Sequence, residues 1–137
     1  MSLTKYNIII AGSRNFADYA KMRTEALRAI REAFNKINKS DVTIISGGAR
    51  GADALGERFA KEFGLNCHII KADWDKHGKK AGYLRNEQMA EFARAIDNAY
   101  DEVKNMLIAF WDGVSPGTKH MIEIAKNKRI NVIVVKC

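Results

Sequence analysis

Residues 44–64 read IISGGARGADALGERFAKEFG, in which an apolar segment passes through a glycine-rich turn into a segment with helical spacing. A short apolar run is typical of a buried strand, and Gly64 is a typical residue at the C-terminal end of a helix. Glycine permits a positive φ and lets a ligand approach the backbone, and the first turn of a helix has unpaired N–H groups. The turn, with Gly47, Gly48 and Gly51, is therefore a candidate phosphate site.

The same alternation of strand and helix continues outward on both sides. We expect five strands, at residues 6–12, 42–48, 66–72, 105–111 and 130–135. Between the strands we expect helices at 18–36, 52–64, 83–96 and 118–128. We also expect a polar loop at 73–82. Because the strands are apolar on both faces, the pattern predicts an α/β fold with a mostly parallel sheet and helices on each side. Such sheets bind ligands at the carboxyl ends of their strands, near the point where the strand order reverses.

The length and composition predict a single domain spanning residues 1–137, of which 47% are hydrophobic. No run approaches the roughly 18 apolar residues of a membrane span, and the N-terminus has no export-signal pattern, so we expect a cytoplasmic protein with no membrane partner. The two cysteines, Cys67 and Cys137, are far apart and form no cluster with histidine. We therefore expect no disulfide framework, no bound metal and no resident cofactor.

The net charge of +7 is spread along the chain. Residues 1–70 hold 11 Lys and Arg against 7 Asp and Glu, and residues 71–137 hold 12 against 9, which gives +4 and +3. The densest basic segments, KHGKK (76–80) and KNKR (126–129), contain no aromatic residue. Platforms for single-stranded nucleic acid combine basic and aromatic side chains. The charge therefore favours a solvated basic surface over a dedicated nucleic-acid face, and an acidic small molecule would draw on the same positive field.

Glycine with a hydroxyl or basic side chain recurs in three of the four turns that follow predicted strands, at 12–16, 47–53, 73–86 and 111–120. Arg14 and Arg50 could each hold a phosphate through two parallel hydrogen bonds. Asp53, one turn into its helix, could cap that helix or accept hydrogen bonds from a ribose hydroxyl. One such turn is as readily explained by the tight connection itself, but three at one sheet edge favour a binding site.

Two common nucleotide-binding signatures are absent from the sequence. The segment GSRNFAD (12–18) has one glycine where a dinucleotide-binding fold has GxGxxG, and the chain contains no GxxxxGK[ST] loop. We therefore do not expect a standard dinucleotide dehydrogenase or a P-loop nucleotidase.

Four segments together resemble the SLOG (SMF/DprA–LOG) superfamily, in its small single-domain branch related to YspA and YpsA. They are IIIAGSRNF (8–16), TIISGGARGADALGERFAKEFG (43–64), ADWDKHGKKAGYLRNEQM (72–89) and LIAFWDGVSPGTKHMIEIAK (107–126). The resemblance implies a Rossmann-like, three-layer fold that binds nucleotides or molecules derived from them. It also implies a homodimer, and a role as a ligand sensor or processing enzyme in bacterial, plasmid and phage conflict.

The resemblance gives roles to individual residues. The superfamily's first phosphate loop matches residues 46–51, and its second, PGGxGT in the LOG phosphoribohydrolases, is represented by DGVSPGT (112–118). Arg85 resembles an arginine that lines the LOG site. The glutamate that follows the GT pair in LOG enzymes is missing here, and the next acid, Glu123, is expected on another helical face. This departure argues against LOG-type hydrolysis.

We therefore expect a sensor-like site for a phosphorylated, nucleotide-derived small molecule such as an ADP-ribose-like ligand. Trp74 or Tyr83 would face the base, although both rings could instead pack under the polar loop. Arg85 and Asn86 would close the site. The predicted ligand-binding residues are Gly12, Ser13, Arg14, Gly47, Gly48, Ala49, Arg50, Gly51, Asp53, Trp74, Tyr83, Arg85, Asn86, Asp112, Ser115, Gly117 and Thr118.

Two other functions stay open at this point, and the catalytic residues of any reaction are unknown. A nucleotide hydrolase would cleave an N-glycosidic or phosphate linkage with one of the aspartates Asp53, Asp73, Asp75 and Asp112. A DprA-like binder of single-stranded DNA would lose affinity steeply as salt rises. The dispersed charge places this second alternative last.

Overall fold

The computed structural model describes residues 3–34 and 36–137. These residues form five strands, β1 (Thr4–Gly12), β2 (Val42–Ser46), β3 (Asn66–Ile69), β4 (Glu102–Trp111) and β5 (Asn131–Lys136). The helices are α1 (Tyr19–Ala33), α2 (Ala52–Phe63), α3 (Trp74–His77), α4 (Ala81–Arg94) and α5 (Pro116–Asn127), with short 3-10 helices η1 (Lys39–Asp41) and η2 (Gly78–Lys80). The helix expected at 18–36 ends at Ala33, and its predicted continuation includes Asn35, which lies outside the described residues. None of the helices in the described ranges is both long and apolar enough to cross a membrane.

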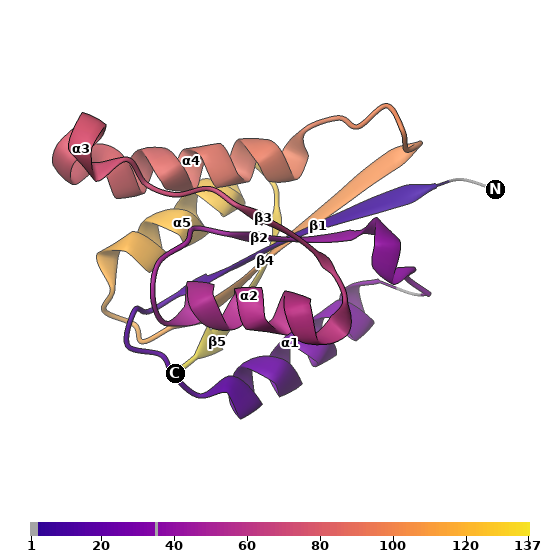
Figure 1. Cartoon of the computed structure of the whole chain (residues 1–137), viewed down its shortest axis with the longest axis horizontal. Coiled ribbons are helices and arrows are strands. Elements are labelled where there is room, and N and C mark those ends of the chain that lie inside the picture. The colour runs from indigo at the N-terminus through magenta and orange to yellow at the C-terminus, as the bar shows by residue number, and fades with distance from the viewer. Residues whose placement is uncertain (1–2, 35) are drawn as a thin grey trace.

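The strands form one parallel sheet in the order β3-β2-β1-β4-β5. The order reverses between β1 and β4, which pair side by side from Thr4 and Glu102 to Gly12 and Phe110. Helices α1 and α2 cover one face of the sheet, and α4 and α5 cover the other (Figure 1). The predicted α/β fold, with a parallel sheet of five strands between two helical layers, is confirmed.

The central strands are buried on both faces, which explains why their sequences do not alternate. In β1, Ile8 and Ile10 pack toward α1 and α2, whereas Ile9 and Ala11 pack toward α4 and α5. Successive side chains of a strand point to opposite faces, so a sheet covered on both sides needs apolar residues at every position.

Strand β3 departs from the prediction that all strands are buried. Its four residues are all exposed, because β3 is an edge strand that pairs only with β2. His68 in this strand stacks on Phe92 of α4, with the ring centroids 4.0 Å apart. The covering of the sheet therefore thins at this edge, which the apolar composition of the segment did not indicate.

The polar segment expected as a loop at 73–82 is instead mostly helical. Asp73 caps α3, because its Oδ1 accepts a hydrogen bond from the Lys76 N–H at 3.1 Å. The 3-10 helix η2 follows, and α4 begins at Ala81 rather than at the predicted residue 83. Short helices of this kind carry no periodic apolar pattern, so composition alone indicated a loop.

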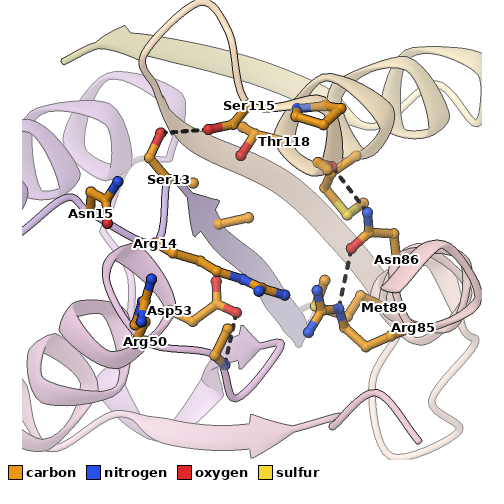
Figure 2. Close-up of a pocket in the computed structure, with 16 residues that line it drawn as sticks. Ser13, Arg14, Asn15, Arg50, Asp53, Arg85, Asn86, Met89, Ser115 and Thr118 are labelled. Carbon is orange, nitrogen blue, oxygen red and sulfur yellow. Dashed lines mark hydrogen bonds between the residues drawn. The ribbon is translucent and has the colours of Figure 1, made fainter. Parts of the chain in front are cut away.

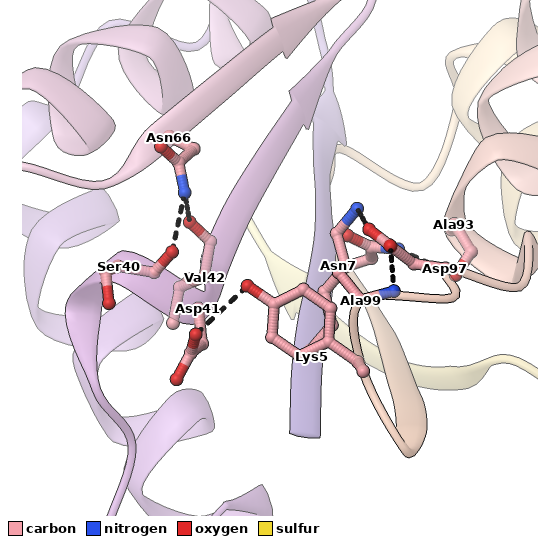
Figure 3. A network of polar contacts seen from close by, with 10 residues as sticks. Lys5, Asn7, Ser40, Asp41, Val42, Asn66, Ala93, Asp97 and Ala99 are labelled. Carbon is pink, nitrogen blue, oxygen red and sulfur yellow. Dashed lines mark hydrogen bonds and ion pairs between the residues drawn. The ribbon is translucent and has the colours of Figure 1, made fainter. Parts of the chain in front are cut away.

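A polar network closes the sheet at the amino ends of the strands (Figure 3). The Tyr100 hydroxyl donates to Asp41 Oδ1 at 3.0 Å, and Lys5 Nζ lies 3.0 Å from Asp97 Oδ2. Within the sheet, the buried Asn7 amide donates to the Ala93 carbonyl at 3.2 Å. The contacts of Tyr100 and Asp97 join the segment before β4 to η1 and β1, and the contact of Asn7 joins β1 to α4. Polar groups here therefore hold the fold together.

Candidate ligand site

A cavity of about 390 Å³ lies at the opposite, carboxyl edge of the sheet (Figure 2). The turns after β1, β2 and β4 contribute to it, together with the middle of α4 and the N-terminal part of α5. Its position is the point where the strand order reverses, at which open α/β sheets bind ligands. Its volume is within the range of small-molecule sites.

Backbone contacts fix the turn after β1 against its neighbours. The Ser13 N–H donates to the Phe110 carbonyl of β4 at 3.0 Å, and the Ala52 N–H of α2 donates to the Ser13 carbonyl at 3.1 Å. Gly51 has a φ of 77°, and a Cβ there would overlap with the backbone of Ser13 and Arg14. Glycine is therefore required at Gly51 for α2 to approach this turn so closely.

Two helices begin at the cavity without a side-chain cap. Gly51 is the N-cap of α2 and Ser115 the N-cap of α5, and neither makes a capping hydrogen bond through a side chain. Gly117 and Thr118, in the first turn of α5, line the cavity. The positive end of each helix dipole is thus available to an anion.

Three arginines line the cavity, and one of them is already positioned by hydrogen bonds. Arg85 Nη1 donates to the Gly47 carbonyl at 2.7 Å, and its Nε donates to Asn86 Oδ1 at 3.3 Å. Burial lowers the pKa of Arg85, which the nearby Asp53 partly offsets. Arg14 extends toward Arg85, and Arg50 lies on the far side of Asp53 (Figure 2). The cavity therefore carries a surplus of positive charge.

Asp53 is the one acidic residue among the described residues that line the cavity. It is 5% exposed, and its Oδ2 accepts a hydrogen bond from the Ala49 N–H at 3.1 Å. Burial raises the pKa of Asp53 to about 6, and this effect exceeds the opposing influence of the Ala49 N–H and of Arg85. The carboxylate is therefore held in an environment that disfavours its charge.

Asn86 joins the two helices on the other side of the cavity. Its side chain is 4% exposed, and its Nδ2 lies 3.1 Å from the Gly117 carbonyl and 3.2 Å from His120 Nδ1. The His120 ring packs against Tyr83, with centroids 4.3 Å apart. These contacts hold the first turn of α5 against α4.

Asp112 shapes the loop before α5. Its Oδ1 accepts hydrogen bonds from the backbone N–H groups of Val114 and Ser115, which lower the pKa of Asp112 to about 2. The Ser115 hydroxyl donates to Asp112 Oδ2 at 2.9 Å and lies 3.3 Å from the Ser13 hydroxyl. Asp112 does not itself line the cavity, but it orients the Ser115 hydroxyl, which does.

The structure brings most of the predicted residues together at the cavity. Those that line it are Gly12, Ser13, Arg14, Ala49, Arg50, Asp53, Arg85, Asn86, Ser115, Gly117 and Thr118. Gly47, Gly48 and Gly51 instead shape the turn after β2, and Asp112 shapes the loop after β4. Trp74 and Tyr83 do not line the cavity and remain about half exposed, at 49% and 45%. Trp74 lies beside it, with the Arg14 guanidinium 5.7 Å from its ring.

Sequence reasoning missed five residues that line the cavity, namely Ala11, Asn15, Met89, Pro116 and Met121. The methionines are buried at helical spacing on α4 and α5, so their pattern could not be told from that of core residues. Asn15 lies in the turn 12–16 that the sequence had singled out, and its polar side chain was a usable signal.

Comparisons with known proteins show what the chain is similar to in sequence and in fold. A family model described as "YAcAr: YspA, cpYpsA-related SLOG family" matches residues 6–77. The Gene 61 protein of Mycobacterium phage D29 is 32% identical over 131 residues, which cover 92% of this chain and 93% of the phage protein. The structure of DNA processing protein A (DprA) from Streptococcus pneumoniae matches 98% of this chain with a TM-score of 0.65 at 16% identity. The chain spans about half of that protein, 51%, and the likeness shows a shared fold.

Proposed function

Because the chain belongs to the YspA, cpYpsA-related SLOG family, we propose that it binds a phosphorylated, nucleotide-derived small molecule in the cavity at the carboxyl edge of its sheet. Its role is that of a ligand sensor. The observation that carries the proposal is the convergence on one cavity of three arginines and two helix N-termini that have no side-chain cap.

The magnitudes support an anionic ligand. A helix N-terminus contributes about 0.3–2 kcal/mol toward an anion and a charge-assisted hydrogen bond about 1.5–3 kcal/mol, whereas micromolar affinity needs about 8 kcal/mol. One turn alone therefore falls short. The summed contributions of the α2 and α5 N-termini and of Arg14, Arg50 and Arg85 reach about 8 kcal/mol, because all five groups meet at one cavity.

The indole of Trp74 is the proposed contact for the base. It is half exposed, and it lies against Arg14 at the border of the cavity. A base stacked there would leave the phosphate within reach of Arg14 and of the α5 N-terminus. Tyr83 is less suited to this role, because its ring already packs on His120.

Ligand-observed proton NMR with AMP, ADP, ADP-ribose and NAD tests the proposal. We expect selective line broadening of the ligand signals with the wild-type protein. Arg14→Ala and Arg50→Ala should each weaken the affinity at least tenfold and so reduce the broadening. Arg28→Ala is the matched control, because Arg28 is exposed on α1, pairs with Glu25 and does not line the cavity. Unchanged affinity in both cavity variants would contradict the proposal.

A nucleotide hydrolase is the second candidate, and Asp53 is the observation that favours it. Among the acids considered from the sequence, Asp53 lines the cavity, whereas Asp73, Asp75 and Asp112 do not. Glu123 is exposed on α5. An enzyme would produce growing signals of free base or ribose phosphate in the same NMR samples, and Asp53→Asn would stop them.

A further inference from the structure

Asp53 is a buried carboxylate that the described contacts leave half satisfied. Its Oδ2 accepts the Ala49 N–H, whereas its Oδ1 receives no hydrogen bond from the described residues. No described cation lies within salt-bridge distance of it, since the ion pairs of the described chain involve other carboxylates. Arg85, whose charge acts more strongly on Asp53 than that of Arg14 does, donates instead to the Gly47 carbonyl.

We propose that Asp53 selects ligands that carry hydroxyl groups beside their phosphate, as the ribose of a nucleotide does. This inference rests on the proposed binding of a phosphorylated ligand and names a determinant of its specificity. Asp53 Oδ1 would accept a hydrogen bond from a sugar hydroxyl while the arginines and helix N-termini hold the phosphate.

Helix capping does not explain the carboxylate. The hydrogen bond from Ala49 comes from the turn that precedes α2, and no N–H group of the α2 first turn donates to Asp53. A favourable dipole would lower the pKa of a carboxyl group near a helix start. The net effect of the surroundings of Asp53 is the opposite, because burial dominates.

Phosphate binding alone does not explain it either. A carboxylate next to a bound phosphate repels it and weakens the positive field of Arg14, Arg50 and Arg85. A cavity built only for inorganic phosphate would therefore be better without Asp53. The carboxylate becomes favourable when the ligand also brings a donor, because a hydrogen bond to a charged group is stronger than one between neutral groups.

Calorimetric titration with AMP and with 2′,3′-dideoxy-AMP tests the inference. The two probes share the base and the phosphate and differ in the sugar hydroxyls. We expect the wild-type protein to bind AMP about tenfold or more tightly. Equal affinities would overturn the selection by hydroxyl groups and leave the proposed phosphate site standing, whereas no binding of either probe or of ribose 5-phosphate would overturn both.

The variant Asp53→Asn isolates the residue. Its amide oxygen can keep the hydrogen bond from the Ala49 N–H, which places the amide NH₂ where Oδ1 stood and replaces an acceptor by a donor. We expect the ratio of the affinities for AMP and for 2′,3′-dideoxy-AMP to fall close to one. The variant should bind 2′,3′-dideoxy-AMP as tightly as the wild type does, or more tightly.

The matched control is Glu32→Gln, which removes the same charge from an exposed position on α1. It should keep the full preference for AMP. Retention of that preference in Asp53→Asn would overturn the inference. The comparison of the two probes on the wild-type protein does not depend on the folding of any variant.

Discussion

At the scale of single residues, Asp53 is the proposed determinant of ligand selection, and its ionisation also affects the stability of the fold. Its pKa rises from 3.8 to about 6 on folding, so the folded protein holds this proton more tightly than the unfolded chain does. The stabilisation is fully present below pH 3.8 and is lost as the pH rises through about 6. One pKa unit is about 1.4 kcal/mol, so the ionised carboxylate lowers the free energy of unfolding at neutral pH by about 3 kcal/mol.

We therefore expect Asp53→Asn to be more stable than the wild-type protein at pH 8, by up to about 3 kcal/mol, and nearly equal to it at pH 4. Urea unfolding at several pH values measures the difference, which should grow between pH 4 and 6. Glu32→Gln should show no such growth. A variant that is less stable than the wild type at pH 8 would show that the carboxylate stabilises the fold.

At the scale of secondary-structure elements, the start of α2 is positioned by the absence of a side chain. Gly51 and Gly64 flank this helix and both have a positive φ, 77° and 65°. A Cβ at Gly51 would overlap with the backbone of Ser13 and Arg14, whereas a Cβ at Gly64 would meet nothing within 4 Å. The two glycines also differ in backbone conformation, because Gly64 is in the left-handed helical region with a ψ of 33°, whereas Gly51 has a ψ of −129°.

We expect Gly64→Ala to lower the free energy of unfolding by about 1 kcal/mol, which is the strain of a left-handed residue with a Cβ. Gly51→Ala should lower it by about 1–3 kcal/mol more, because its φ and ψ lie outside the regions that L-residues adopt and because α2 or the turn after β1 has to move. Urea unfolding measures both, and AMP affinity should fall only for Gly51→Ala. Equal effects of the two substitutions would mean that neither the conformation of Gly51 nor the close approach adds to the cost.

The elements also show how far sequence patterns reach. The strands and long helices were predicted within a few residues, because their apolar positions follow regular periods. The prediction of a loop at 73–82 was wrong. Helix α3 has only four residues and is fixed by the Asp73 cap, so it shows no apolar periodicity in the sequence. The exposure of β3 was also missed, since a composition of apolar residues does not say which strand lies at an edge.

At the scale of the whole molecule, strand order converts separate turns into one cavity. The sequence predicted that functional residues follow strands, and the turns after β1 and β4 meet because Gly12 pairs with Phe110 across 98 positions of the chain. Alternation of strands and helices does not encode which strands are neighbours. Trp74 and Tyr83 could not be placed from the sequence either: neither lines the cavity, and Tyr83 packs on His120.

The distribution of charge over the whole molecule distinguishes a small ligand from DNA. The surplus of +7 is divided almost evenly between the two halves of the chain, whereas the cavity gathers three arginines around one aspartate. A binder of single-stranded DNA that neutralises several phosphates loses affinity with a log–log salt slope of about −0.7 per phosphate. Recognition concentrated in one cavity neutralises only the few charges of a nucleotide.

We therefore expect AMP affinity to fall with a shallow salt slope, and fluorescence anisotropy of a labelled oligonucleotide to show no binding at physiological salt. Tight oligonucleotide binding with a steep slope, unaffected by Arg50→Ala, would instead favour a DNA-binding surface outside the cavity.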